Sequence, residues 1–264
     1  MKRIITGTLA MGLWLLLLYF NSFQLFWFVF GLIAAIGVNE YFNMVFKNEG
    51  AGFHLLFFVC GVLPLLASGM GSIDILNAAL VLGFTLLCVF IVFARASAAS
   101  PFKLITCSCF GVFYCGYMAA HIIMIMGLRN GAVWLLFLST VTVASDTGAY
   151  FSGKSLGRHK LCPLISPKKT IEGFIGGLIC GTGAATAIAA WLLPTTNIYL
   201  AAFAAFILTC LGVLGDLTES IIKRAMQVKD SGTILPGHGG ILDRADSLML
   251  TAPIFYYMLH TGVL

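Results

Sequence analysis

The chain has 264 residues, of which 60% are hydrophobic and only 9% are charged, and its mean hydropathy is +1.00. Ordinary soluble domains are about 45–50% apolar and about 25% charged. This composition excludes a soluble globular domain and indicates an integral membrane protein.

Apolar runs of about 20 residues, enough to cross a hydrocarbon core of roughly 30 Å, follow one another along the chain. They lie at 4–20, 23–42, 53–69, 75–94, 104–126, 132–150, 172–193, 198–215 and 247–263. We predict an all-α, polytopic membrane protein with about nine transmembrane helices and a polar site on its cytoplasmic face. No small-x-small cleavage site follows the first run, so we expect a retained helix rather than a signal peptide.

The basic residues are distributed asymmetrically between the two sides of this topology. With nine spans, the N-terminus and the loops after the second, fourth, sixth and eighth helices share one side. These segments hold 14 of the 15 Lys and Arg residues, and only Arg129 lies opposite. Loops rich in Lys and Arg face the cytoplasm. We therefore expect a multi-pass protein of the inner (cytoplasmic) membrane, with the N-terminus and the active-site loops in the cytoplasm.

The acidic residues are concentrated in the second half of the chain. Seven of the ten lie between Asp146 and Asp246. We expect residues 1–130 to form transmembrane scaffold helices and residues 131–264 to form the catalytic transmembrane region with its cytoplasmic loops. No linker or repeat separates them, so both belong to one integrated membrane domain.

Ser166-Pro167 is typical of a helix start, with Ser as N-cap and Pro at the first helical position. Lys168 and Lys169 then fall in the first turn of the seventh helix, where cations oppose the helix dipole. A bound anion would make this arrangement favourable. A basic loop resting on anionic lipid headgroups explains the same residues equally well.

Small residues recur every four positions along the seventh helix. They are Gly173, Gly177, Gly181, Ala185 and Ala189. Such a stripe allows another helix to approach closely. Whether that neighbour belongs to the same chain or to a second subunit stays open.

A charged segment follows the eighth apolar run. Asp216 and Glu219 resemble the N-cap and third position of a new helix. From Ser220 onward, polar residues fall on one helix face and apolar residues on another, as in an amphipathic helix on the membrane surface. The loop 231–240 is rich in Gly and Pro. Its glycines permit positive φ and a backbone concavity that binds anions.

Asp243 and Asp246 lie three residues apart at the start of the ninth helix, hence on one face. Arg244 beside them, or a capping role for Asp243, would explain them structurally. A divalent cation is the alternative that we prefer, because Mg²⁺ takes oxygen ligands and shares itself with substrate phosphates. Ionisable residues near the membrane are candidates for function.

The second half of the chain resembles the phosphatidate cytidylyltransferases, or CDP-diacylglycerol synthases. The resemblance is carried by Ser220-x-Ile222-Lys223-Arg224-x4-Lys229-Asp230-x-Gly232-x2-Leu235-Pro236-x-His238-Gly239-Gly240-Ile241-x-Asp243-Arg244-x-Asp246. Two upstream stretches, Asp146 to Tyr150 and Ser166 to Gly173, also resemble that family. Ala245 departs from its pattern, where we expect a larger aliphatic residue. The first 130 residues match only in hydrophobicity and span number.

The resemblance implies that CTP and phosphatidic acid react to CDP-diacylglycerol and pyrophosphate at the bilayer surface, with Mg²⁺ and room for a second cation. It implies metal ligation by Asp216, Asp243 and Asp246, which with Lys223 and Arg224 form the expected catalytic set. The expected phosphate-binding set is Lys168, Lys169, Lys229, His238, Gly239, Gly240 and Arg244. His238 would donate a hydrogen bond or stabilise the turn. We expect no nucleic-acid partner and leave open a homodimer through membrane helices.

Two other classes of protein compete with this interpretation. A polyprenol kinase, or another membrane enzyme that uses CTP or a lipid phosphate, would share the metal-binding and basic loops. A transporter would place its ionisable groups near the bilayer midplane in two matching halves. The ionisable groups here collect on one side, and no matching halves are present in the sequence.

Overall fold

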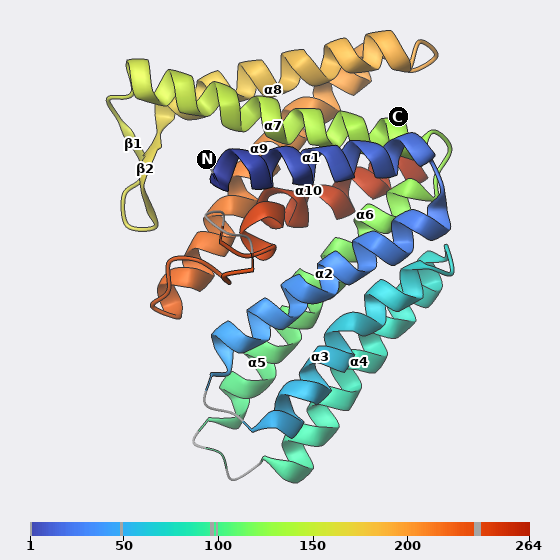
Figure 1. Ribbon diagram of the computed structural model, residues 1–264, viewed down its shortest axis with the longest axis vertical. Coiled ribbons are helices and arrows are strands. Elements are labelled where there is room, and N and C mark those ends of the chain that lie inside the picture. Colours follow the sequence, from blue (N-terminus) through green and yellow to red (C-terminus); the bar gives the residue numbers. More distant parts are fainter. Residues whose placement is uncertain (1, 48–49, 96–97, 99, 235–238) are drawn as a thin grey trace. The chain divides into compact units, whose positions relative to one another are not determined.

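The computed structural model describes residues 2–47, 50–95, 98, 100–234 and 239–264, and helices dominate it (Figure 1). The helices are α1 (Lys2–Phe20), α2 (Phe23–Val45), α3 (Ala51–Ser68), α4 (Ile73–Ala94), α5 (Pro101–Gly111), α6 (Met118–Met126), α7 (Gly131–Leu156), α8 (Ile171–Leu192), α9 (Ile198–Ala225) and α10 (Leu242–His260). A π-helical stretch, η1 (Val112–Tyr117), joins α5 to α6 without a break. Two short strands, β1 (Lys160–Cys162) and β2 (Ser166–Thr170), pair antiparallel.

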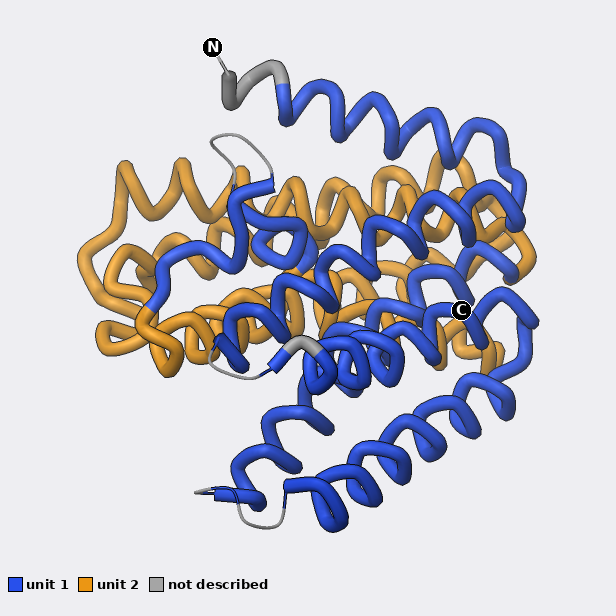
Figure 2. The backbone as a smooth tube through the Cα atoms, turned by 60° about the horizontal axis from the view of Figure 1, so that its bottom comes forward, with its two compact units in different colours: residues 1–127, 228–245 blue, residues 128–227, 246–264 orange. Residues whose placement is uncertain are grey.

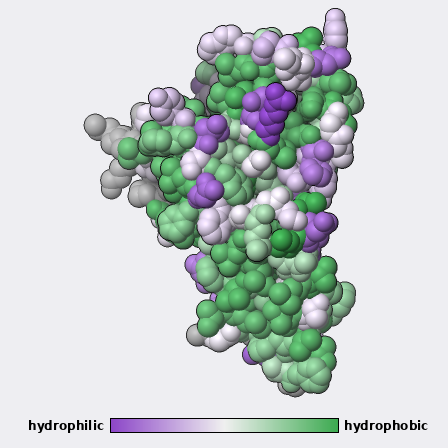
Figure 3. All heavy atoms as spheres, turned by 90° about the vertical axis from the view of Figure 1, so that its right-hand side faces the viewer, coloured by the Kyte–Doolittle hydropathy of each residue, from purple (hydrophilic) through white to green (hydrophobic). Residues whose placement is uncertain are grey.

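Each predicted apolar run corresponds to a helix in the described part of the chain. Among the described residues, six helical segments are long and apolar enough to cross a membrane, counting Pro101–Met126 as one, and Thr6–Phe20 and Gly52–Ser68 are shorter apolar helices. Large apolar side chains such as Phe93 and Trp191, 85% and 77% exposed, lie on the outside. Figure 3 shows that apolar residues cover much of the face in view. These findings confirm the all-α, polytopic membrane fold.

The chain divides into two compact units, coloured separately in Figure 2. Unit 1 contains residues 1–127 and 228–245, and unit 2 contains residues 128–227 and 246–264. Residues 228–245, which include the glycine-rich loop, therefore belong to the same unit as helices α1 to α6. The predicted division of labour at residue 130, with a scaffold before it and a catalytic region after it, stays a prediction.

Aromatic side chains fill the core of unit 1. Phe42 of α2, Phe46 at its C-cap, and Phe53 and Phe57 of α3 lie against one another, with the rings of Phe46 and Phe57 stacked at 5.0 Å between centroids. All four side chains are buried. Such ring pairs add to the free energy gained by burial, and they fix α2 against α3.

The core of unit 2 depends on the small-residue stripe of α8, all five members of which are buried. A Cβ on Gly177 would lie 2.9 Å from the carbonyl oxygen of Ser145, and one on Gly181 would lie 3.1 Å from that of Val141. Both carbonyls belong to α7. The neighbour that the stripe admits is therefore a helix of the same chain, which resolves the alternative left open by the sequence.

The predicted start of the seventh helix at Ser166 is wrong. Ser166 to Thr170 form strand β2, and α8 begins at Ile171 with Thr170 as its N-cap, whose side chain accepts a hydrogen bond from the N–H of Gly173. A proline is tolerated on an exposed edge strand, and the hairpin with β1 competes with a first helical turn. Lys168 and Lys169 thus lie on a strand.

The predicted helix start at Asp216 is also wrong. α9 runs without interruption from Ile198 to Ala225, so Asp216 and Glu219 lie inside it. At 1.5 Å per residue this 28-residue helix is about 42 Å long, which exceeds the roughly 30 Å of a hydrocarbon core. The amphipathic segment from Ser220 onward is the end of a long helix and not a separate helix on the surface.

Candidate functional site

In unit 2, strand β2 and helix α9 are joined by an ion pair. The ammonium nitrogen of Lys169 lies 2.5 Å from Oδ2 of Asp216, with the two side chains 25% and 32% exposed. The hydroxyl of Ser220 donates a hydrogen bond of 3.4 Å to the other oxygen of Asp216. One predicted phosphate ligand and one predicted metal ligand therefore meet directly.

A second carboxylate, Asp246, lies close to this pair. It precedes the apolar run of α10, and burial, together with the neighbouring charges of Asp216 and Asp146, raises the pKa of its carboxyl to about 7. The backbone N–H of Ser247, which donates to Oδ1 at 2.6 Å, opposes this rise in pKa. The charges of Asp146 on α7 and Asp216 on α9 thus both act on Asp246 on α10. Asp246 was predicted as a site residue, and Asp146 was noted only as part of a motif.

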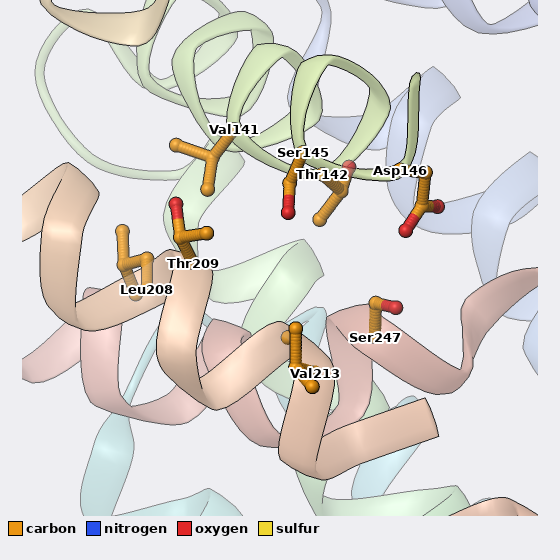
Figure 4. A pocket seen from close by; sticks show the side chains of 9 residues that line it. Val141, Thr142, Ser145, Asp146, Leu208, Thr209, Val213 and Ser247 are labelled. Atoms are coloured by element: carbon orange, nitrogen blue, oxygen red, sulfur yellow. The ribbon is translucent and has the colours of Figure 1, made fainter. Parts of the chain in front are cut away.

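A small pocket lined by both apolar and polar side chains lies at Asp146 (Figure 4). Its polar lining comes from Thr142, Ser145 and Asp146 of α7, Thr209 of α9 and Ser247 of α10. No single stretch of sequence contains this set, because three helices must pack before it forms. The pocket gives the aspartate cluster a polar neighbourhood among otherwise apolar helices.

Farther along α9, a predicted catalytic cation is bound to a buried acid. The ammonium nitrogen of Lys223 lies 2.5 Å from Oε2 of Glu219, whose side chain is fully buried. The two residues are one helical turn apart. Arg224, next to Lys223, is exposed. Lys223 therefore compensates a buried charge, which is expensive to leave unpaired, while Arg224 faces outward.

The hairpin that carries Lys168 and Lys169 is tied to α8 by Glu172. Its carboxylate accepts hydrogen bonds from the backbone N–H groups of Arg158 and His159 and lies 2.7 Å from Nδ1 of His159. Glu172 lies in the first turn of α8, where an acidic residue also favours the helix dipole. Lys168 is exposed and Lys169 half-buried, because successive strand residues point to opposite sides.

In unit 1, Asp243 binds the glycine-rich loop. Its Oδ2 accepts hydrogen bonds from the N–H of Ser231 at 2.9 Å, the hydroxyl of Ser231 at 3.0 Å and the N–H of Gly240 at 2.8 Å. Asp243 lies in the first turn of α10 and binds back to the backbone that leads into the helix. One oxygen of Asp243 is thus engaged in holding the loop, and the N–H of Gly240 is engaged with it.

The remaining predicted ligands of unit 1 lie at its surface or outside the described residues. Lys229 and Arg244 are exposed. Gly239 has a φ of +81°, as the sequence anticipated for this loop. His238 lies outside the described residues. Sequence reasoning missed Glu40, whose carboxylate on α2 contacts the same loop; a lone acid in an apolar run was the available signal.

The described residues contain no group of three or more His, Cys, Asp or Glu side chains arranged to hold a metal ion. The donor chemistry nevertheless suits Mg²⁺, which takes carboxylate oxygens and keeps several waters or substrate oxygens. Asp246, half-buried beside two like charges, gains most from a cation. The carboxylates of unit 2 therefore fit a metal ion that they share with waters or substrate oxygens. They do not form a complete metal site of protein ligands alone.

The fold and these charges define a polytopic membrane protein with a polar, charged site among its helices. A family model described as the cytidylyltransferase family matches residues 1–261. The chain belongs to this family, which confirms the resemblance seen in its sequence.

Curated relatives agree with this assignment. The chain is 36% identical over 265 residues to a protein from Staphylococcus haemolyticus, strain JCSC1435, covering 97% of this chain and 98% of that one. It is 48% identical over 130 residues to a Staphylococcus aureus protein, strain COL, and 47% identical over 148 residues to a Bacillus subtilis protein. These matches cover 49% and 55% of this chain and 50% and 55% of the relatives. All three relatives are named phosphatidate cytidylyltransferase.

Proposed function

We propose that this protein transfers the cytidylyl group of CTP to phosphatidic acid, giving CDP-diacylglycerol and pyrophosphate. The observation that carries the proposal is the likeness to a phosphatidate cytidylyltransferase over 97% of the chain. The charged residues of unit 2, Lys169, Asp216 and Asp246, support the proposal, since both substrates carry phosphates and one of them carries acyl chains. An enzyme that joins them needs anion-binding groups on a membrane-embedded frame.

In the reaction, a phosphate oxygen of phosphatidic acid attacks the α-phosphorus of CTP. The new P–O bond forms as the bond between the α-phosphorus and the bridging oxygen breaks, and that oxygen leaves with pyrophosphate. Such transfers are accelerated by positioning and by neutralising charge. In this proposal Lys169 moves from Asp216 to a substrate phosphate, and Arg224 of the same unit attracts further negative charge. Lys229 and Arg244 stay predicted phosphate ligands.

Asp216 and Asp246 would hold the magnesium ion, with Asp146 beside them. When bound, the ion supplies charge neutralisation at the triphosphate. The pairing with Lys169 keeps the carboxylate of Asp216 oriented before the ion binds. Asp243, the third ligand expected from the sequence, has one oxygen committed to the loop of unit 1, so we assign it to orienting that loop. A second cation stays a prediction.

We also infer that the polar site faces the cytoplasm of a cell's inner membrane, since 14 of 15 basic residues lie on one predicted side. A homodimer stays a prediction, and the α8 stripe gives it no support because α7 covers the stripe.

Purified protein in detergent micelles, given labelled CTP, phosphatidic acid and Mg²⁺, should form a lipid-soluble cytidine product and release pyrophosphate in equal amounts. A polyprenol kinase would instead transfer the γ-phosphate to a polyprenol and leave no cytidine on the lipid. A transporter would form neither product. Absence of the cytidine lipid with active-site-saturating substrates would rule out the proposed reaction.

A further inference from the structure

Glu40 of α2 binds a segment about 190 positions later in the chain. Its carboxylate accepts hydrogen bonds from the N–H of Ile241 at 3.1 Å, the N–H of Leu242 at 3.0 Å and the hydroxyl of Ser231 at 3.3 Å. Glu40 is buried, with 4% of its surface exposed. Buried carboxylates are costly unless hydrogen-bonded, and the first N–H groups of α10 meet this need.

The side chain of Glu40 explains why positions 232 and 240 are glycines. A Cβ on Gly232 would collide with Oε1 of Glu40, and a Cβ on Gly240 would collide with Oε2 of Glu40 and the hydroxyl of Ser231. The three atoms that a Cβ on Gly232 would approach most closely all belong to the Glu40 side chain. These two glycines are therefore needed for the approach of a carboxylate of the protein itself.

The carboxylates of Glu40 and Asp243 both bind Ser231, at the start of the glycine-rich loop. The hydroxyl of Ser231 lies between them, 3.3 Å from Oε2 of Glu40 and 3.0 Å from Oδ2 of Asp243. Four backbone N–H groups complete the arrangement, those of Ser231 and Gly240 on Asp243 and those of Ile241 and Leu242 on Glu40. The start of α10 is thus fixed on α2.

We propose that Glu40 is a positioning residue for cytidylyl transfer, which sets the start of α10 and the glycine-rich loop in the geometry that catalysis requires. The inference rests on the proposed function. In this proposal Glu40 does not bind substrate, because its oxygens accept hydrogen bonds from the backbone and from the hydroxyl of Ser231. It acts through Arg244, which lies in the same unit and in the first turn of the helix whose start Glu40 holds.

The test compares Glu40→Gln and Glu40→Ala with the wild type, and uses Asp74→Asn as a matched control. Asp74 is an exposed acid in the first turn of α4, also in unit 1. Glutamine keeps the shape and one acceptor oxygen, but its NH₂ group faces donors. We expect kcat to fall about tenfold in Glu40→Gln and about a hundredfold in Glu40→Ala, since misorientation by about 1 Å costs that much.

Amide hydrogen exchange measures the contact without any substrate. The amides of Ile241 and Leu242 should exchange faster in both Glu40 variants and at the wild-type rate in Asp74→Asn, while those of α3 stay protected. An active wild type with unchanged kcat in Glu40→Gln would overturn the inference and leave a merely structural contact. An inactive wild type would overturn the proposed function instead. Should Glu40→Ala fail to fold, Glu40→Gln decides alone.

A double-mutant cycle tests the same contact from the other side. Gly232→Ala should lower kcat in the wild type, because its Cβ collides with Glu40, and should add no further loss in Glu40→Ala, where the colliding atoms are gone. Equal losses in both backgrounds would mean that Gly232 serves another purpose, and the assignment of the loop geometry to Glu40 would fail.

Discussion

Lys169 and Asp216 neutralise each other across strand β2 and helix α9, with 2.5 Å between the ammonium nitrogen and Oδ2. Both side chains are partly exposed, so the pair contributes only about 0–1 kcal/mol to stability. It is therefore inexpensive to break. In the proposed reaction a substrate phosphate would compete for the lysine and a cation for the aspartate, and binding of both would separate the pair at little cost.

Replacing Lys169 with Ala should lower kcat/KM by about a hundredfold, whereas Lys168→Ala should lower it by less than about fivefold, as only Lys169 turns toward Asp216. Steady-state kinetics with CTP and phosphatidic acid varied separately measure both. Lys168→Ala is the matched control, being the neighbouring lysine on the opposite side of the strand. Equal effects of the two substitutions would indicate that the hairpin acts by net charge alone.

Replacing Asp246 with Asn should lower turnover by at least about a hundredfold at ordinary Mg²⁺, in line with the several kcal/mol that a metal contributes to charge stabilisation. The fold should survive, because asparagine keeps the shape and removes a charge that is repelled by Asp216 and Asp146. A chelator should silence the wild type equally. Restored Mg²⁺ should recover the wild type and not the variant.

The Asp243→Asn variant tests whether Asp243 binds a metal ion or holds the glycine-rich loop. Because Oδ2 of Asp243 accepts three hydrogen bonds within unit 1, we expect faster amide exchange at Ser231 and Gly240 and an unchanged Mg²⁺ concentration for half-maximal activity. A large rise in that concentration would return Asp243 to the metal site, as the sequence first indicated.

Glu172→Gln should loosen the β1–β2 hairpin, since its carboxylate accepts from two backbone N–H groups and the ring of His159. Limited proteolysis at 157–166 should become faster, and the KM for a phosphate substrate should rise about threefold to tenfold with little change in kcat. Unchanged cleavage would show that strand pairing alone holds the hairpin.

Gly181→Leu should destabilise unit 2 by about 1–3 kcal/mol or more, because its side chain would enter the contact with Val141, Ser145 and Thr209. Gly183→Leu is the control, as nothing lies within 4 Å of the position that a Cβ would take there. Thermal unfolding in detergent should separate the two variants clearly. A similar melting temperature for both would contradict close packing of α8 on α7.

Single cysteines at positions 160 and 229, in a protein stripped of its eight native cysteines, should be protected from an impermeant reagent added outside the cell. Both positions belong to the predicted cytoplasmic loops. A cysteine at 264 should react, since nine spans put the C-terminus on the far side. Labelling at 160 or 229 from outside would contradict the nine-span topology.

The sequence alone determined the class of fold and the family. Spans are set by local hydrophobicity, because a bilayer requires about 20 apolar residues wherever the chain crosses it, and the described helices follow the predicted runs closely. The charged motifs from Lys168 to Asp246 were equally visible, since few charges occur elsewhere. The sequence also showed patterns within one helix, such as the small-residue stripe of α8. It did not show which helix packs against that stripe.

Only the tertiary structure decided where helix α8 begins, where helix α9 ends and which side chains meet. Ser166-Pro167 satisfied a local rule for a helix start, but pairing with Lys160 to Cys162 made the segment a strand. The contacts of Lys169 with Asp216 and of Glu40 with Leu242 join residues 47 and 202 positions apart. Such contacts leave no periodic trace in the sequence, because they depend on how whole helices pack and not on the neighbours of each residue.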